Sequence, residues 1–99
     1  MEKFGYVMAT KMLVDNKRKV NYMYHEKGDS AQDSGWRFFC GDEDDDYVKN
    51  PDNIAIYDVN TILAIDKSIL PYLSSKEEIA FERKDENSAF EIVKRETGK

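Results

Sequence analysis

Asp33–Asp46 reads DSGWRFFCGDEDDD and joins the most strand-like run of the chain to its most charged segment. Side chains alternate between the two faces of a β-strand. A strand over Trp36–Cys40, bounded by the two glycines of the stretch, therefore directs Trp36, Phe38 and Cys40 to one face. We expect this apolar face to lie in the core and the acids after it to lie on the surface. No arrangement of side chains in the stretch performs an identifiable reaction.

The rest of the chain contains further strand-like segments. Phe4–Leu13 and Val20–His25 are rich in residues that fit a pleated surface, and the turn-forming residues between them predict an antiparallel hairpin. Glu78–Arg83 and Ala89–Val93 are joined by a polar segment and predict a second hairpin. Ile54–Tyr57 is predicted to be a brief strand.

Helical signals are fewer and shorter. Asp58 is predicted to cap a helix that begins with apolar side chains at helical spacing in Val59–Leu63. Ser68–Leu73 contains a proline and is predicted to be a separate turn that packs its three apolar side chains, Leu70 among them, on the core. Tyr47–Pro51 is at most a short helical turn. Strands followed by a helix and then strands predict an α+β domain, with a mainly antiparallel sheet and one or two short helices.

Length and composition predict one domain over residues 1–99, and the tail Lys94–Lys99 is predicted to be frayed. The single cysteine excludes an internal disulfide and suits a reducing compartment. The first residues, MEKFG, lack the long apolar run of a secretory signal, and the longest apolar runs are too short to cross a membrane. We therefore expect a cytoplasmic protein that does not contact a membrane.

The formal net charge of -5 is placed unevenly. Residues 42–58 hold seven acids and one lysine, whereas the other 82 residues hold 14 basic and 13 acidic side chains. Direct binding of nucleic acid is not expected, because the phosphate backbone rewards clustered lysine and arginine. A local acidic surface instead attracts a basic partner, with exposed aromatic residues as anchors. The predicted partner-binding residues are Asp42, Glu43, Asp44, Asp45, Asp46 and Tyr47.

A metal ion is an alternative use of the acids. Asp42, Asp44 and Asp46 alternate as at the start of a calcium-binding loop. However, the sixth position of such a loop is Tyr47 in place of glycine, and the twelfth is Asn53 in place of glutamate. A solvated acidic loop is the favoured interpretation, partner binding comes next, and a structural calcium or magnesium ion is the least favoured. No cofactor is predicted.

A catalytic thiol is the other chemical alternative. Cys40 and His25 are the only residues of their kinds, so a thiol nucleophile with an imidazole base would need this pair. The strand alternation places Cys40 in the core, where a buried, unreactive thiol is favoured. One histidine and one cysteine also do not build an ordinary zinc site. Arg37 is expected to be structural, paired with nearby carboxylates or stacked on an aromatic ring. We therefore predict that the protein is not an enzyme.

Several short sequence motifs resemble those of immunity protein family 33 of bacterial polymorphic toxin systems, formerly a domain of unknown function. The resemblance implies a small single-domain binder that neutralises a toxin made by the same or a neighbouring cell, and it assigns no catalytic residue. It covers roughly residues 5–93, which the resemblance implies to be the core of the domain. The motifs are DSGWRFF at Asp33–Phe39, GDED at Gly41–Asp44, NPDNI at Asn50–Ile54, IYDVNTI at Ile56–Ile62 and AFER at Ala80–Arg83.

The first hypothesis is therefore a non-catalytic protein that neutralises a basic toxin, such as a nuclease, through its acidic surface. The alternative is a generic ligand-binding or regulatory module with no toxin partner, and an enzyme comes third. The absence of a convergent nucleophile, base and orienting group counts against an enzyme. It does not separate the first two hypotheses.

Overall fold

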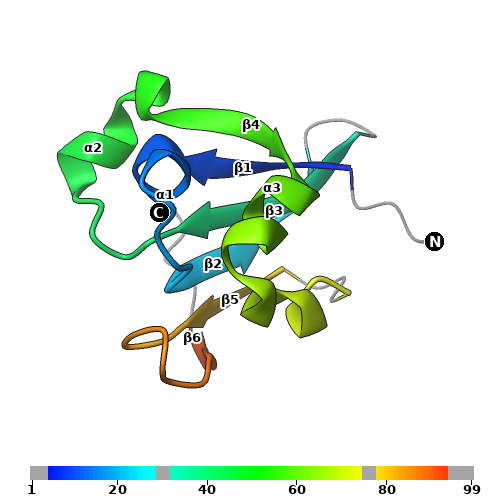
Figure 1. The fold of residues 1–99 in the computed structure, drawn as a ribbon. Helices are drawn as coiled ribbons and strands as arrows, with labels where there is room; N and C mark the ends of the chain where they lie inside the picture. The colour runs from blue at the N-terminus through cyan, green and yellow to red at the C-terminus, as the bar shows by residue number, and fades with distance from the viewer. Residues whose placement is uncertain (1–4, 29–31, 75–77, 94–99) are drawn as a thin grey trace.

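Six strands form one sheet in the computed structural model, which describes residues 5–28, 32–74 and 78–93 (Figure 1). The predicted frayed tail, Lys94–Lys99, lies outside these residues. The strands are β1 (Tyr6–Thr10), β2 (Tyr22–His25), β3 (Asp33–Phe39), β4 (Ile54–Asp58), β5 (Ile79–Glu82) and β6 (Glu91–Val93). Their order across the sheet is β4-β1-β3-β2-β5-β6. Among the described strands only the pair β1 and β3 is parallel, which confirms the mainly antiparallel α+β prediction.

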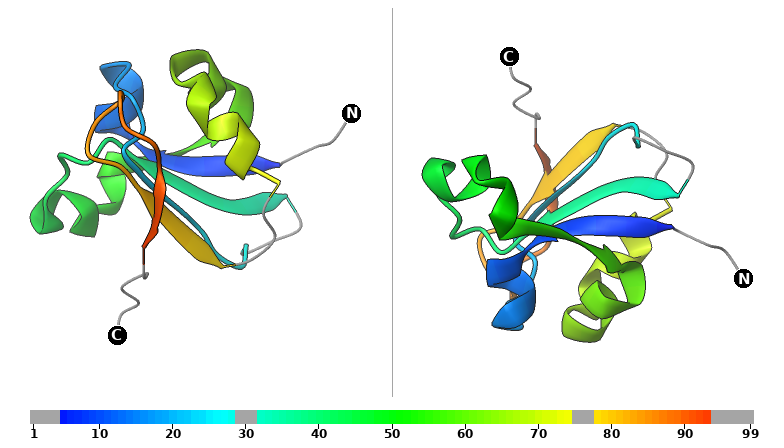
Figure 2. Two further views of the ribbon diagram at one scale, coloured as in Figure 1. Left: turned by 90° about the horizontal axis from the view of Figure 1, so that it is seen from below. Right: turned by 90° about the horizontal axis from the view of Figure 1, so that it is seen from above.

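Five short helices accompany the sheet in the part of the chain that the structure describes, more than the one or two predicted. They are α1 (Lys11–Asp15), α2 (Asp45–Lys49), α3 (Val59–Ile65) and the 3-10 helices η1 (Pro51–Asn53) and η2 (Lys67–Tyr72). Figure 2 shows α1, α3 and η2 on one face of the sheet and α2 beyond one end of it. The opposite face, which we call the helix-free face, carries no described helix. No described helix is long and apolar enough to span a membrane.

The predicted alternation in β3 is confirmed. Trp36, Phe38 and Cys40 are at most 1% exposed and form the centre of the core beneath the helices. The Trp36 ring stacks on Phe38 and Phe81, with ring centroids 6.0 and 6.4 Å away. Burial of these large apolar surfaces is the main source of stability in a domain of this size.

Gly35 lies inside β3 and does not bound it. Its φ is +90°, and a Cβ atom at this position would stand 2.0 Å from the backbone oxygen of Glu26 in the neighbouring chain segment. Only glycine fits this close approach. The strand consequently begins at Asp33, three residues before the predicted start, and ends at Phe39.

The predicted hairpin of the first two strands is wrong. β1 ends at Thr10, because the Thr10 hydroxyl accepts a hydrogen bond from Leu13 N and caps α1. β3 then lies between β1 and β2, so the two strands are not neighbours. The second predicted hairpin is confirmed as β5 and β6, although both strands are shorter than predicted.

The predicted cap of α3 is confirmed, since the Asp58 carboxylate accepts a hydrogen bond of 2.8 Å from Asn60 N. The turn that follows is η2, in which Ile69 is buried; Leu73, the residue directly after η2, is buried as well. Leu70 is 52% exposed, so its predicted packing on the core is wrong. A 3-10 helix has three residues per turn, and a residue directly after a buried one therefore points to another side.

Two buried arginines form ion pairs that hold distant segments together. Arg37 donates two hydrogen bonds of 2.9 Å to the Asp33 carboxylate and one of 2.7 Å to Glu26. Arg37 therefore pairs with carboxylates, as predicted, but its partners lie outside the run of five acids. Arg83 donates a hydrogen bond of 2.6 Å to Asp66, which joins β5 to the segment between α3 and η2.

Candidate partner-binding surface

The run of five acids at residues 42–46, which we call the acidic loop, begins where β3 leaves the sheet. Gly41 makes the turn with a φ of +99°, in the left-handed region that favours glycine. A Cβ atom here would stand 3.2 Å from Asn21 Cβ, closer than ordinary packing contacts. The sharp turn carries the acidic loop away from the core and toward α2.

Glu43 is the acid of the loop whose carboxylate forms the most hydrogen bonds with the rest of the described structure. Its half-buried carboxylate accepts hydrogen bonds from the Thr10 hydroxyl and from the backbone N–H groups of Cys40 and Gly41. Burial opposes ionisation of this carboxyl, but these hydrogen bonds outweigh burial and lower the pKa of Glu43. Glu43 therefore fixes the loop to the end of β1 and contributes little charge that a partner could reach.

Two further acids of the loop also have internal partners. Asp42 forms an ion pair with Arg18, and both side chains are largely exposed. Asp44 accepts a hydrogen bond of 2.8 Å from Tyr47 N and thereby caps α2. An exposed ion pair contributes little to stability, whereas a helix cap contributes about 1 kcal/mol. Asp44 is consequently a structural residue as well as a surface charge.

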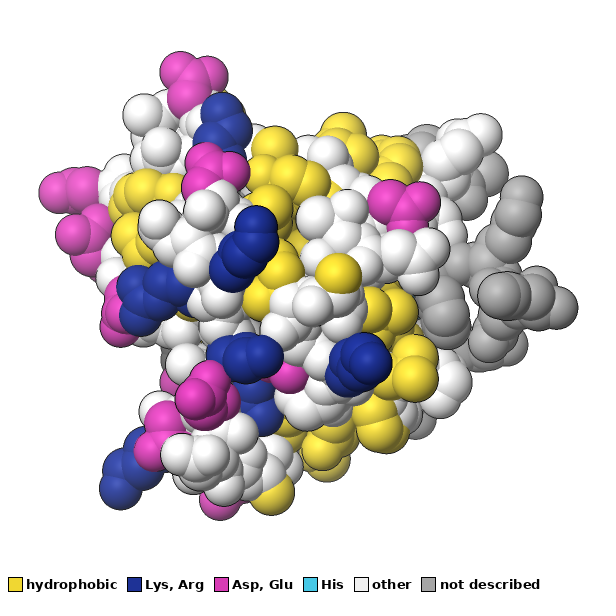
Figure 3. Space-filling model, viewed as in Figure 1, with side chains coloured by type: hydrophobic (Ala, Val, Ile, Leu, Met, Phe, Trp, Pro, Cys, Tyr) yellow, Lys and Arg dark blue, Asp and Glu magenta, His cyan; other side chains and the backbone are white. Residues whose placement is uncertain are grey.

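Asp45 and Asp46 are the acids that project most freely. Both are exposed and lie in the first turn of α2, where the helix dipole favours negative charge. Neither forms an ion pair with any other residue that the structure describes. Acidic side chains gather at this end of the molecule in Figure 3. The structure thus divides the predicted site into acids that hold the loop and acids that face solvent.

Tyr47 is not the fully exposed aromatic residue that we expected. It is half-buried, and its hydroxyl accepts a hydrogen bond of 2.9 Å from Met12 N at the start of α1. Its backbone oxygen accepts another, of 2.9 Å, from the Asn53 amide. Tyr47 therefore fixes α2 beside α1 and η1, and its role as an interface anchor stays a prediction.

An aromatic cluster on the helix-free face was not predicted as a surface feature. The rings of Tyr22, Tyr24 and Phe39 lie with centroids 5.5 to 5.9 Å apart. The period-two spacing of Tyr22 and Tyr24 was the available signal, since it places both on the face opposite Met23. β4, the strand that follows α2 and η1, forms one edge of this face.

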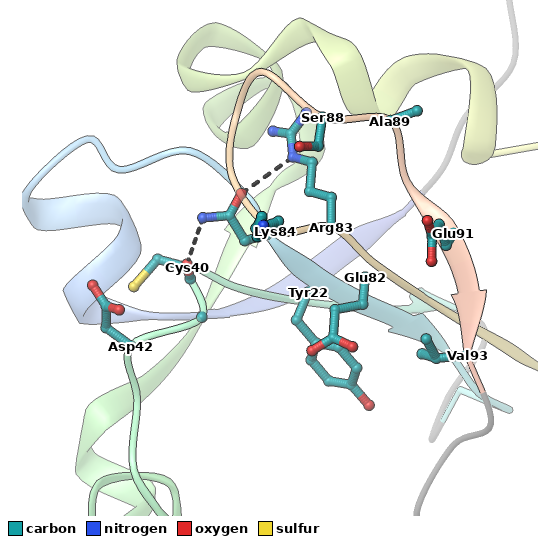
Figure 4. Close-up of a pocket in the computed structure, with 12 residues that line it drawn as sticks. Tyr22, Cys40, Asp42, Glu82, Arg83, Lys84, Ser88, Ala89, Glu91 and Val93 are labelled. Atoms are coloured by element: carbon teal, nitrogen blue, oxygen red, sulfur yellow. Dashed lines mark hydrogen bonds between the residues drawn. The ribbon is translucent and has the colours of Figure 1, made fainter.

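A hollow of about 650 Å³ lies at the end of the sheet between the β3 exit and the hairpin of β5 and β6 (Figure 4). In its lining the Asn21 amide donates to the Cys40 backbone oxygen and accepts from Arg83. Its lining mixes charges of both signs. The lining residues are Asn21, Tyr22, Cys40, Gly41, Asp42, Glu82, Arg83, Lys84, Ser88, Ala89, Glu91 and Val93.

The hollow does not bring together the two residues that a thiol mechanism would need. Cys40 borders it, but the thiol is buried and burial raises its pKa. His25 lies at the opposite end of the paired strands β2 and β3, with its Nε2 atom 2.9 Å from Ser34 O. Among the described residues, no group of histidine, cysteine and acidic side chains is arranged to hold a metal ion.

Comparison with known proteins identifies a family. No curated protein and no solved structure matches the chain. A model of the Immunity protein Imm33 domain matches residues 7–94, which include every strand and helix described above except Tyr6, the first residue of β1. The chain therefore belongs to the Imm33 immunity protein family.

Proposed function

We propose that this protein is a non-catalytic immunity protein that neutralises a toxin by binding it through the acidic loop and α2. The observation that carries the proposal is the Imm33 match over nearly the whole chain. A toxin is the partner that this family implies. The proposal places the encounter in the cytoplasm, where a lone thiol such as Cys40 stays reduced.

The chemistry of the surface favours a basic toxin, such as a nuclease. Residues 42–58 carry a net charge of -6, while the rest of the chain is nearly neutral. An enzyme that binds nucleic acid presents lysine and arginine to phosphates, and the same side chains are attracted to clustered carboxylates. Because Glu43 and Asp44 hold the loop in one conformation, the exposed carboxylates of Asp45 and Asp46 are already in place before a partner arrives.

The test begins with the partner recovered by affinity purification from the native cytoplasm. The partner is expressed in a host that lacks this protein, with and without the protein supplied in trans, and growth is measured. We expect the partner to stop growth and the protein to restore it. A partner that is harmless on its own would contradict the immunity role and favour a general regulatory module.

Two charge-reversed variants separate the effect of the acidic surface on protection from the effect of the total charge of the protein. Asp45→Lys/Asp46→Lys changes the exposed acids of α2, and Glu78→Lys/Glu86→Lys makes the same charge change at exposed positions near β5. We expect only the first variant to protect growth poorly. Equal protection by both variants would show that the toxin binds elsewhere on the protein.

A further inference from the structure

We propose that β4 is a strand-addition site, to which a basic, extended segment of the partner pairs as a seventh strand. The inference rests on the proposed function, since it states how the toxin is held. β4 is the last strand at one edge of the sheet, directly after α2 and η1. Figure 2 (right) shows its length from η1 to α3 uncovered by any described helix or strand.

Alternate residues of β4 turn their backbone N–H and C=O groups to this open edge. Tyr6 donates its N–H to Gln32 O, on the β3 side of β1. Backbone groups alternate in direction along a strand, and the antiparallel register sets Tyr6 opposite Asp58. Tyr6 and every second residue after it in β1 turn their backbone groups toward β3. The β4 residues opposite them therefore turn their own N–H and C=O groups away from β1. These residues are Ile54, Ile56 and Asp58.

A second contact agrees with this direction. The N–H of Ile54 donates to Pro51 O in η1, which lies outside the sheet. Ile56, at the centre of the strand, is 57% exposed. β4 contains no proline or lysine and pairs with β1 over five residues without a bulge, so it lacks common devices that block edge pairing. The strand is therefore long enough and accessible enough to accept a partner strand.

Charge decides which partner fits. The acidic loop and Asp52 lie before β4, and Asp58 ends it, so acids flank both ends of the strand. A second copy of this chain would bring a second segment of charge -6 against the first, which opposes pairing. A segment that carries lysine or arginine would be attracted instead.

The neighbouring side chains add a second requirement. Ile56 pairs across the sheet with half-buried Met8, on the helix-free face. A shallow depression of about 90 Å³ lies on this face beside Ile54, lined also by Tyr24, Phe39 and Arg37, whose charge is paired with Asp33 and Glu26. An added strand would direct alternate side chains to this apolar face. The segment that fits best alternates small apolar residues with lysine or arginine.

The test uses a synthetic heptapeptide of alternating lysine and valine, blocked at both ends, as the probe. Backbone amide shifts of the whole protein are followed by NMR as the peptide is added. We expect the largest shifts in β4 and slower hydrogen exchange of the Ile56 N–H. The same peptide with glutamate in place of lysine should bind at least tenfold more weakly.

Variants at one position test the backbone contact. Ile56→Pro removes an N–H that points away from the sheet and should weaken peptide binding roughly tenfold or more. Ile56→Thr keeps the N–H and should bind within about threefold of the parent. If Ile56→Pro fails to fold, the exchange rate of the Ile56 N–H in the unmodified protein decides the question.

Three results would overturn the inference: shifts centred away from β4, equal binding of the glutamate peptide, or a dimer of this protein paired through β4. Each would leave the immunity role intact, because growth protection is measured without the peptide. Conversely, peptide binding at β4 together with a harmless native partner would reject the immunity role and keep the strand-addition site.

Discussion

The hydroxyl of Thr10 donates a hydrogen bond of 2.5 Å to the carboxylate of Glu43, 33 residues later in the chain. The same hydroxyl accepts the Leu13 N–H that begins α1. One threonine thus ends β1, starts a helix and holds the acidic loop. The run of acids is therefore not a uniform charged surface, since Glu43 is part of the fold.

Glu43→Gln should lower stability near neutral pH and change its dependence on pH. The pKa of Glu43 is lowered in the folded protein, so its contribution to stability is fully present above the unfolded pKa and is lost as pH falls through the folded pKa. Urea unfolding of parent and variant from pH 7 to pH 3 should show a difference in unfolding free energy that shrinks in acid. A difference that stays constant over this range would show that the charge of Glu43 has no part in fixing the acidic loop to β1.

Trp36→Ala should cost roughly 3 to 5 kcal/mol of unfolding free energy, because a large ring leaves a cavity in the centre of the core. Trp36 is 1% exposed and stacks on Phe38 and Phe81. Ile92→Ala, at a position 69% exposed, is the matched control and should change stability by about 0.5 kcal/mol or less. Thermal melts that show both variants as stable as the parent would reject this account of the core.

Local patterns explain what the sequence predicted correctly. The alternation of Trp36, Phe38 and Cys40 determines which face of β3 is buried, and Asp58 before an apolar helical pattern determines where α3 begins. Both signals act within a few residues. The acidic loop was also visible from sequence, because a run of five acids cannot be buried.

Partners that are distant in sequence explain what was missed. Nothing near β1 indicates that β3, more than twenty residues later, pairs with it in parallel and separates it from β2. The partners of Glu43 and Arg37 likewise depend on the assembled sheet. The cap at Thr10 is different, since threonine before a short apolar run is a local signal that could have ended the predicted strand earlier.

The buried pair of Arg83 and Asp66 should be strongly coupled. Arg83→Met alone should cost about 3 to 5 kcal/mol, because it leaves the Asp66 carboxylate buried without its cation. A double-mutant cycle with Asp66→Leu should show that the two single losses are not additive. The exposed pair of Arg18 and Asp42 provides the control cycle and should show a much smaller coupling. Equal coupling in both cycles would contradict the role of burial.

Cys40→Ala should lose on the order of 1 kcal/mol of stability and keep partner binding. The thiol is buried and its pKa is raised by burial, so labelling of the native protein should be slow and should become fast only in denaturant. The backbone N–H of Cys40, which donates to Glu43, remains in the variant. Rapid labelling of the native thiol, with loss of binding in a folded variant, would show that Cys40 acts directly.

The exposed acids of α2 should set the rate of association with a basic toxin. Asp45 and Asp46 are the residues to change, because replacing Asp44 would also remove the cap of α2. Asp45→Lys/Asp46→Lys should slow association and flatten its dependence on salt, since charges at the rim of an interface act mainly on the on-rate and are screened by ions.

The measurement is association kinetics at low and at physiological salt, for the parent, this double variant and the control Glu78→Lys/Glu86→Lys. Long-range attraction by net charge alone would slow both variants equally, because each changes the total charge by the same amount. Steering by α2 would slow only the first variant and reduce only its salt slope. If the parent and both variants gave equal on-rates and equal slopes, the acidic loop would be a solvated surface, and the toxin would have to be recognised by another part of the protein.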